Sequence, residues 1–397
     1  MHPHQFTLTR RQVRDHAAAL LQSRLRLGDF GRKATASCLL HVLFAAASWV
    51  TSIHDACRRL LKAPSDETVR QALFAGLPGY AELQRRLNRA LAADIPKALR
   101  LRRRKLALDL TLIPYHGLAK HSPEEIYRGQ AKAGTRNFHA YATAYAAHKG
   151  RRYTLALTGV LAGEALDDVV RRLLRQAARV GVRPRLVLLD KAFGIGPVVR
   201  YLQAARRPFL LAFRPRGRKP GHPKGASGTW ALCQQLPRSG WARYAWQDKE
   251  GRRVSLDVCV VYRRFRDRRG RHHKKTELFG CWGLHQVQPR WLRETYRRRF
   301  AIESSYRQMN QARVRTSSRD PALRLLYVGL ALVLRNVWVW LHEAVLSSPR
   351  RGGRAYNPQR LRFKPLLDWL RQVAEETLGA RTFVAAERQP PTTLAKA

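Results

Sequence analysis

The stretch of sequence that decides the fold is KLALDLTLI, residues 105–113. Its four leucines stand at alternate positions, and successive side chains of a strand point to opposite faces, so the leucines share one face. Asp109 falls on the other face, between Ala107 and Thr111. The alternation therefore predicts a β-strand that carries a carboxylate on the face opposite the leucine row.

Further elements follow this strand in a definite order. After residues 105–113 come strand-like runs at 139–147 and 152–160, an amphipathic helix at 163–180, an apolar strand at 186–189 and a helix at 194–205. A doubly wound sheet would need a helix directly after its first strand. The order strand, strand, strand, helix, strand, helix instead predicts an α/β fold with a ribonuclease-H-like mixed sheet.

The remaining segments differ in periodicity and composition. Residues 12–100 show apolar positions at helical spacing, and residues 209–284 are rich in glycine, arginine and tryptophan with strand-like pieces. Helical patterns return further on, at residues 289–314, 321–346 and 360–378. Residues 347–353 have the composition of a linker, and the tail around Pro390 and Pro391 that of a disordered segment.

These patterns predict four parts. They are an α-helical domain at 1–100, a mixed-sheet domain at 101–208 and 286–346, a mostly β insertion at 209–285, and a C-terminal linker, helix and disordered tail at 347–397. The charge and the motifs described below make the first of these the expected DNA-binding domain and the second the expected catalytic domain. Within the first part, residues 52–62 and 66–74 could form a helix-turn-helix in which Ser65 caps the second helix. An ordinary helical hairpin fits the same pattern.

The charge of the chain points to a polyanionic partner. Lysine and arginine total 76 against 27 aspartates and glutamates, which gives a formal net charge of +49. Arginines recur along the whole chain, as at residues 102–104 and 297–299. Contacts of such side chains with phosphates release condensed counterions and give affinity that does not depend on base sequence. We expect double-stranded DNA as the partner, with a merely solvated basic surface as the alternative.

Other features indicate the compartment. The five cysteines form an odd set without C-x-x-C spacing, so neither a disulfide framework nor a zinc module is expected. Residues 1–14 are too polar for a signal peptide. Residues 325–346 are apolar but contain Arg335, Asn336 and His342, which favours a buried helix over a membrane span. We expect a protein of the bacterial cytoplasm, associated with the nucleoid and not with a membrane.

Two aspartates are candidates for catalysis in a chain that has few acids. Asp109 lies in an otherwise apolar strand, and a lone buried carboxylate is costly unless it is paired or metal-bound. Asp190 follows the apolar strand at 186–189, at the edge where open sheets bind ligands. The structural alternatives are an ion pair of Asp109 with an arginine and a helix-capping role for Asp190.

A third acid lies on the helix predicted at 289–314. At about 100° per residue, five polar side chains fall within roughly an 80° arc of that helix. They are Tyr296, Arg299, Glu303, Arg307 and Asn310. Glu303 supplies a third carboxylate, and Arg299 can grip a phosphate through its planar guanidinium. The alternative is an ordinary ion pair within the helix.

These motifs resemble the insertion-sequence DDE transposases that carry a Tyr-x-x-Arg-x-x-x-Glu signature. The matching segments are LALDLTLIPYHG around Asp109, LVLLDKAF around Asp190 and YRRRFAIESSYRQMN from Tyr296 to Asn310, within residues 105–346. The chain departs from the family where a lysine usually stands seven residues after the glutamate, since it has Asn310 there. Arg307, Arg313 or Arg315 would have to supply that cation.

The resemblance implies an enzyme that cuts and pastes DNA. Asp109, Asp190 and Glu303 would be catalytic and would hold two Mg²⁺ ions, with Mn²⁺ as a possible substitute. Tyr296, Arg299, Arg307 and Asn310 would contact the DNA. The expected partners are transposon ends and target DNA, bound by a homodimer. Two alternatives remain: a catalytically inactive DNA-binding relative, and a metal-dependent nuclease that cuts without joining.

Tryptophans in the predicted insertion suggest one more hypothesis. Trp230, Trp241, Trp246 and Trp282 could stack on a base that is flipped out of the transposon end. Packing in the core is the alternative for each of them. The pair His272 and His273 with Cys281 lacks the spacing of zinc ligands.

Overall fold

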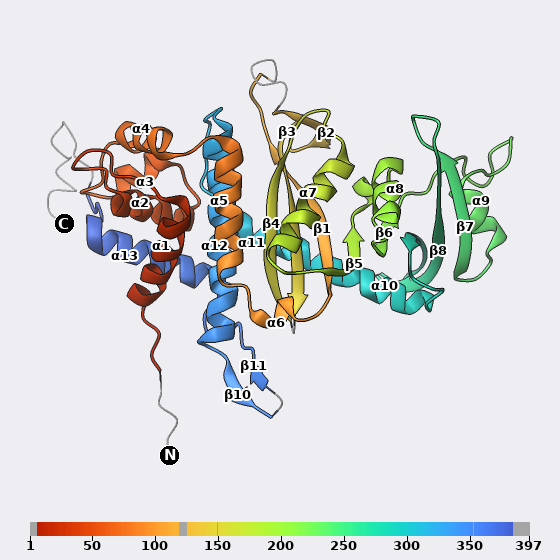
Figure 1. Cartoon of the computed structure of the whole chain (residues 1–397). Coiled ribbons are helices and arrows are strands. Elements are labelled where there is room, and N and C mark those ends of the chain that lie inside the picture. Colours follow the sequence, from red (N-terminus) through yellow and green to blue (C-terminus); the bar gives the residue numbers. More distant parts are fainter. Residues whose placement is uncertain (1–5, 119–124, 149, 268, 352, 384–397) are drawn as a thin grey trace. The chain divides into compact units, whose positions relative to one another are not determined.

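The computed structural model describes residues 6–118, 125–148, 150–267, 269–351 and 353–383 (Figure 1). The chain forms two compact units. One combines residues 1–90 with 308–397, and the other comprises residues 91–307. The first unit is therefore built from both ends of the chain.

The second unit is built on one mixed sheet. Its central strand β1 (Arg104–Pro114) lies between an antiparallel and a parallel neighbour, β3 and β5. The other strands of this half are β2 (Tyr127–Lys132), β3 (Thr135–His148), β4 (Arg151–Val160), β5 (Pro184–Leu189) and β6 (Phe209–Phe213). Strand β4 pairs antiparallel with β3, and β6 pairs parallel with β5.

Two helices make the parallel crossovers. Helix α7 (Leu166–Arg179) connects β4 to β5, and α8 (Gly196–Ala204) connects β5 to β6. Helix α7 buries the apolar face that the sequence predicts, from Val169 to Ala177. Antiparallel strands β1 to β4 followed by helix, parallel strand, helix and parallel strand confirm the predicted ribonuclease-H-like α/β fold; β2 is the strand that the sequence patterns did not predict.

The region predicted as a separate β insertion continues the same sheet. Strand β6 was assigned to the insertion, but it pairs with β5, and β9 (His272–Trp282) pairs antiparallel with β6. Strands β8 (Arg253–Arg266) and β7 (Gly240–Gln247) then extend the sheet. Short helix α9 (Thr229–Gln235) precedes β7. This region is rich in strands, but β6, which the prediction placed in the insertion, is a strand of the central sheet; the division into a catalytic domain and an insertion stays a prediction.

The helix predicted at 289–314 is broken. Helix α10 (Pro289–Arg297) is followed by a 3₁₀ turn, η3 (Arg298–Phe300), and by α11 (Ala301–Asn310). The Tyr145 hydroxyl of β3 lies 3.1 Å from the backbone carbonyls of both Arg298 and Arg299. A side chain that donates to main-chain carbonyls in this way competes with the helical ladder, so the break has a tertiary cause.

The first unit is helical. Its helices are α1 (Arg10–Leu25), α2 (Ala36–Trp49), α3 (Ile53–Arg59), α4 (Asp66–Gly76), most of α5 (Tyr80–Ala93), α12 (Pro321–Ala344) and α13 (Phe363–Leu378). Helix α13 packs on α1, α2 and α12. Residues from 308 onward belong to this compact helical unit, although the prediction extended the catalytic domain to residue 346; that domain boundary stays a prediction. The single turn α6 (Lys97–Arg100) lies in the other unit.

The predicted linker at 347–353 contains structure. Strands β10 (Ser348–Arg350) and β11 (Gly353–Ala355) form a two-stranded hairpin. The predicted C-terminal helix is confirmed as α13, which begins at Phe363. The tail around Pro390 and Pro391 lies outside the described residues.

Helix α12 is apolar enough to raise the possibility of a membrane span, but most of its residues are buried in the protein core. It is the one helix of the described residues that is long and apolar enough to span a membrane, and 89% of its most apolar window is buried inside the protein. Arg335 and His342 are buried within it. The predicted buried core helix is confirmed.

The two helices of the predicted helix-turn-helix are present. Ser52 and Ser65 cap α3 and α4, each accepting a hydrogen bond from a backbone amide three residues on. Helix α3 ends at Arg59, earlier than predicted, because residues 59–62 pair with the backbone after α13. The DNA-binding role of these helices stays a prediction.

Candidate active site

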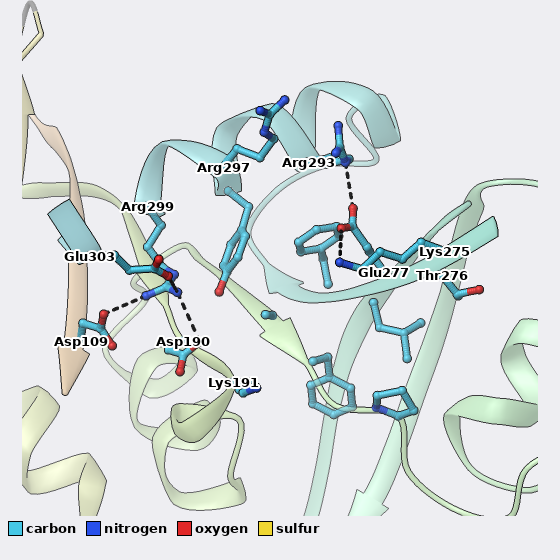
Figure 2. A pocket seen from close by; sticks show the side chains of 16 residues that line it. Asp109, Asp190, Lys191, Lys275, Thr276, Glu277, Arg293, Arg297, Arg299 and Glu303 are labelled. Atoms are coloured by element: carbon cyan, nitrogen blue, oxygen red, sulfur yellow. Dashed lines mark hydrogen bonds and ion pairs between the residues drawn. The ribbon is translucent and has the colours of Figure 1, made fainter. Parts of the chain in front are cut away.

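Three carboxylates from three different elements meet at one pocket of the sheet unit (Figure 2). Asp109 comes from the middle of β1, Asp190 directly follows β5, and Glu303 lies in the first turn of α11. Parallel pairing places Leu108 beside Leu189, so the next residue of each strand is an aspartate at the same level of the sheet. The two motifs are therefore adjacent because of strand register.

The guanidinium of Arg299 lies between the three carboxylates. Its Nη1 is 3.1 Å from Asp109 Oδ2, and its Nη2 is 3.4 Å from Asp190 Oδ1 and 3.7 Å from Glu303 Oε1. The Arg299 side chain is 4% exposed, whereas that of Glu303 is 53% exposed. One buried cation thus holds acids from β1, β5 and α11 around a single point.

Burial determines the protonation of Asp109. It raises the pKa of this carboxyl to about 6, an effect that Arg299 opposes and the nearby Asp190 reinforces. The backbone amide of Leu110 donates to Asp109 Oδ1 over 2.9 Å. The pKa of Asp109 therefore lies well above that of an ordinary aspartate, and a cation beside it favours the ionised form of the carboxyl.

Two tyrosines fix the backbone next to the aspartates. The Tyr306 hydroxyl donates to the backbone carbonyl of Asp109 over 2.9 Å and lies 2.7 Å from Thr143 Oγ1. The Tyr296 hydroxyl donates over 3.1 Å to the carbonyl of Leu189, the residue before Asp190. Helices α10 and α11 are thereby tied to the two strands at the positions that carry the acids.

The predicted site residues have different positions in the structure. The structure brings Asp109, Asp190, Glu303 and Arg299 together in one pocket, and their catalytic and DNA-binding roles stay predictions. Tyr296 also lines the pocket, but it is buried, its ring packs on Phe279 and its hydroxyl is bonded to Leu189. Its predicted contact with DNA stays a prediction.

Arg307 and Asn310 do not line this pocket. Arg307 is exposed on α11, and Asn310 accepts a hydrogen bond from Arg313 Nε over 3.4 Å within the helical unit. The arc predicted for five side chains assumed one continuous helix, and the 3₁₀ turn before α11 changes the direction of the residues that follow it. Their DNA contacts stay predictions.

The contacts bear on the alternative roles of these acids, namely a helix cap for Asp190 and ordinary ion pairs for Asp109 and Glu303. Asp190 makes no capping hydrogen bond to the turn that follows it. The ion pair of Asp109 with an arginine and the Arg299–Glu303 pair within the helix are both present, and they share one guanidinium. When all three acids are ionised, this one guanidinium can balance only one of their three charges. The ion pairs with Arg299 therefore do not by themselves account for three converging carboxylates, whose oxygens could also ligate a metal ion.

Several pocket residues were not predicted from the sequence. Lys191, Lys275, Arg293 and Arg297 add positive charge around the carboxylates, and Glu277 binds both Lys275 and Arg293. Lys191 directly follows Asp190, and that adjacency was a usable signal. The other residues come from β9 and α10, whose approach to the first aspartates depends on the extended sheet.

The donor set suits a hard divalent cation. Within the described residues, no group of three or more histidines, cysteines, aspartates or glutamates is already arranged to hold a metal. The three carboxylates nevertheless converge on one positive charge, and carboxylate oxygen is the donor that Mg²⁺ and Mn²⁺ prefer. A metal fits this donor set, provided that it takes the place of the guanidinium.

The tryptophans of the base-stacking hypothesis have mixed surroundings. Trp246 stacks on Tyr244 and lies under the guanidinium of Arg216, so packing accounts for it. Trp241 and Trp282 line a second hollow, and the Trp241 indole donates to the Val287 carbonyl. Trp230 lies on α9 and is half-buried. Base stacking stays a hypothesis.

The fold and the site define a class of protein, namely ribonuclease-H-like proteins with acids at the same level of two adjacent central strands. Comparison with known proteins assigns the family. Residues 100–337 match the family described as "Transposase DDE domain". The chain belongs to this family of transposases.

A solved structure shows the same fold. The chain is similar to the piggyBac transposase in a synaptic complex with hairpin DNA, studied by cryo-EM, with a TM-score of 0.50 and 12% sequence identity. The similarity covers 94% of this chain and 80% of the other. No curated protein sequence matches the chain.

The raised pKa of Asp109 predicts how stability depends on pH. The folded protein binds this proton more tightly than the unfolded chain, so the proton favours folding at low pH and its contribution is lost as pH rises towards 6. We expect wild type to lose about 1–3 kcal/mol relative to Asp109→Asn between about pH 4 and 7. The measurement is urea unfolding in EDTA at several pH values, with Asp257→Asn as the control. Parallel curves for wild type and Asp109→Asn would contradict the assignment.

The Tyr145 hydroxyl is predicted to hold the turn that aims Arg299. Tyr145→Phe leaves two backbone carbonyls without this donor, which should lower the free energy of unfolding by about 1–3 kcal/mol. Thermal and urea unfolding measure this loss. Tyr201→Phe, whose ring is half-buried on α8, is the control and should be nearly neutral. Equal losses in both variants would remove the special role of Tyr145.

Proposed function

We propose that this chain is an active DDE transposase that binds the terminal repeats of a transposon and catalyses Mg²⁺-dependent DNA cleavage and strand transfer. The observation that carries the proposal is the convergence of the three carboxylates of Asp109, Asp190 and Glu303 on one point. The rest of the chain is strongly basic. Acids gathered where the bound DNA is also anionic require cations between the two.

Asp109, Asp190 and Glu303 would hold the metal, Mg²⁺ or Mn²⁺, as two ions in each active site. Bound metal of this kind activates the attacking oxygen and stabilises the leaving oxygen of a phosphodiester. The protein itself has to keep its three carboxylates in register. Tyr306 and Tyr296 do so through the backbone of Asp109 and of Leu189.

Arg299 has two roles in this proposal. Without metal it pairs with all three acids and reduces the repulsion between them. A metal held by these three carboxylates would compete with the guanidinium for the same oxygens, so Arg299 would have to move away from them. A planar guanidinium pairs with phosphate through two parallel hydrogen bonds, so a displaced Arg299 is suited to grip the DNA strand.

The rim of the pocket suits a phosphate backbone. Lys191, Lys275, Arg293 and Arg297 line it together with the carboxylates, while Phe213, Leu278 and Phe279 form an apolar wall. These cations would attract the phosphate backbone of DNA, and the carboxylates of the same pocket would lie beside a bound phosphate. Basic side chains gathered around catalytic acids support a nucleic-acid substrate.

A catalytically inactive DNA-binding relative is the second candidate. The observation that favours it is the guanidinium between the carboxylates, together with Asn310 in place of a lysine. Such a protein would keep the basic surface and never exchange Arg299 for metal. A nuclease that cuts without joining would share the site and differ only in its products.

Partners and compartment follow from the same proposal. The DNA partners would be transposon ends and target, bound by a homodimer in the bacterial cytoplasm. The similar piggyBac structure is described as a synaptic complex with hairpin DNA, which supports DNA binding here. Whether a hairpin forms on this chain is part of the same test of products.

The decisive test is cleavage and joining of labelled terminal-repeat DNA with Mg²⁺. Asp109→Asn, Asp190→Asn and Glu303→Gln each remove one charge from the site. Each should lower both activities by at least the roughly 10–100-fold that loss of an outer-shell group costs at a metal site, while DNA binding is retained. Asp257→Asn, which lies on β8 and pairs with Arg243, is the control and should cut like wild type.

Three results would change the proposal. Carboxylate variants that cut like wild type would show that the site is wrong. A wild type that binds but neither cuts nor joins would favour the inactive relative. Cleavage without any joined product would favour the nuclease.

A further inference from the structure

Strands β8 and β9 continue past the sheet as a two-stranded ribbon, residues 261–277 (Figure 1). Strand β7 pairs with β8 only as far as Val260, and β6 pairs with β9 only from Leu278. Beyond these points β8 and β9 pair with each other from Val261↔Glu277 to Arg266↔His272. These six pairs make a ribbon about 20 Å long that has no other strand beside it among the described residues.

The ribbon concentrates positive charge. Residues 263–275 read RRFRDRRGRHHKK, with eight arginines and lysines and one acid. Arg263 is paired across the strands with Lys275, and Arg264 with Lys274. Like charges directly opposite each other destabilise a sheet. These side chains therefore repel one another across the two strands, and a bound polyanion would reduce that repulsion.

The contacts within the ribbon shape it without neutralising it. Asp267, the acid of its turn, accepts hydrogen bonds from the backbone amides of Arg269 and Arg271 and pairs with His273. The guanidinium of Arg263 lies 4.4 Å from the centre of the Phe265 ring, which stacks on His273. Stacking and turn geometry thus maintain the strands while most of the charge stays uncompensated.

One face of the ribbon leads to the active-site pocket. Val261 and Phe279 pack in the apolar cluster with Tyr296 of α10, so the residues at every second position continue the same face. Glu277 on this face binds Arg293 of α10, and Lys275 lines the pocket of the three carboxylates. Arg263, opposite Lys275, extends this cationic row, whereas Arg264 and Lys274 point to the other face.

We infer that the ribbon is a DNA-binding arm whose pocket-side face, through Arg263 and Lys275, contacts phosphates of duplex DNA beside the cleavage site. A two-stranded ribbon has dimensions that fit along a duplex, and Lys and Arg side chains on it replace counterions of the backbone. The choice of DNA rests on the proposed function. The contact itself requires neither metal nor cleavage.

The test is the salt dependence of DNA binding by the full chain. Anisotropy of a fluorescein-labelled duplex in EDTA, at salt concentrations from about 50 to 200 mM, gives the slope of log K against log salt. The double variant Arg263→Gln with Lys275→Gln should reduce that slope by about 0.9 for each lost phosphate contact, about two in all. The matched double variant Arg264→Gln with Lys274→Gln removes the same charge from the other face and should keep the wild-type slope.

A single substitution guards against a folding artefact. Arg263 packs on Phe265, so Lys275→Gln alone, at an exposed residue, should reduce the slope by about one with unchanged thermal unfolding. Equal slopes for the two double variants, whether both fall or neither does, would overturn the inference. EDTA removes the metal that the proposed cleavage needs. The binding measurement therefore tests the ribbon independently of whether the protein cleaves DNA.

Discussion

The arrangement of the site depends on one buried guanidinium. Arg299 is 4% exposed and pairs with acids on β1, after β5 and on α11. Removing one partner from such a cluster would leave buried charge uncompensated, a strongly destabilising change. Two hydrogen bonds position the partners of this contact. The Tyr145 hydroxyl donates to the backbone carbonyl of Arg299 in the 3₁₀ turn, and the Tyr306 hydroxyl of α11 donates to the backbone carbonyl of Asp109.

Sheet topology explains how acids so far apart in sequence become neighbours. Parallel register brings Leu108 level with Leu189, and each is followed by an aspartate. Glu303 arrives only after the chain has completed β6 to β9 and returned as α10 and α11. The extended strands therefore carry the third acid back to the first two, and they also supply Lys275 and Glu277 to the same pocket.

Local patterns in the sequence predicted the parts of this site that have local causes. Alternation around Asp109 gave its strand, and the apolar run before Asp190 gave the strand end. The resemblance to DDE transposases grouped both with Glu303. The break before α11 could not be predicted in this way, because its cause is the hydroxyl of Tyr145, about 150 residues earlier in the chain.

The same limit applies to the larger organisation. Nothing local in residues 209–213 distinguishes a strand of an insertion from the last parallel strand of the central sheet, which is a matter of pairing with β5. Residues after 308 read as helical, but only packing shows that α12 and α13 share a unit with the N-terminal helices. Position within the fold, unlike helix or strand type, is fixed by contacts distant in sequence.

The central claim is that a metal can take the place that the Arg299 guanidinium holds between the three acids. Crystals grown with Mn²⁺, examined by anomalous diffraction, test it directly. The account predicts anomalous peaks at about 2.0–2.5 Å from oxygens of Asp109, Asp190 and Glu303, with the Arg299 guanidinium moved away from them. Saturating Mn²⁺ that leaves Arg299 in its present position, with no peak beside these carboxylates, would contradict the account.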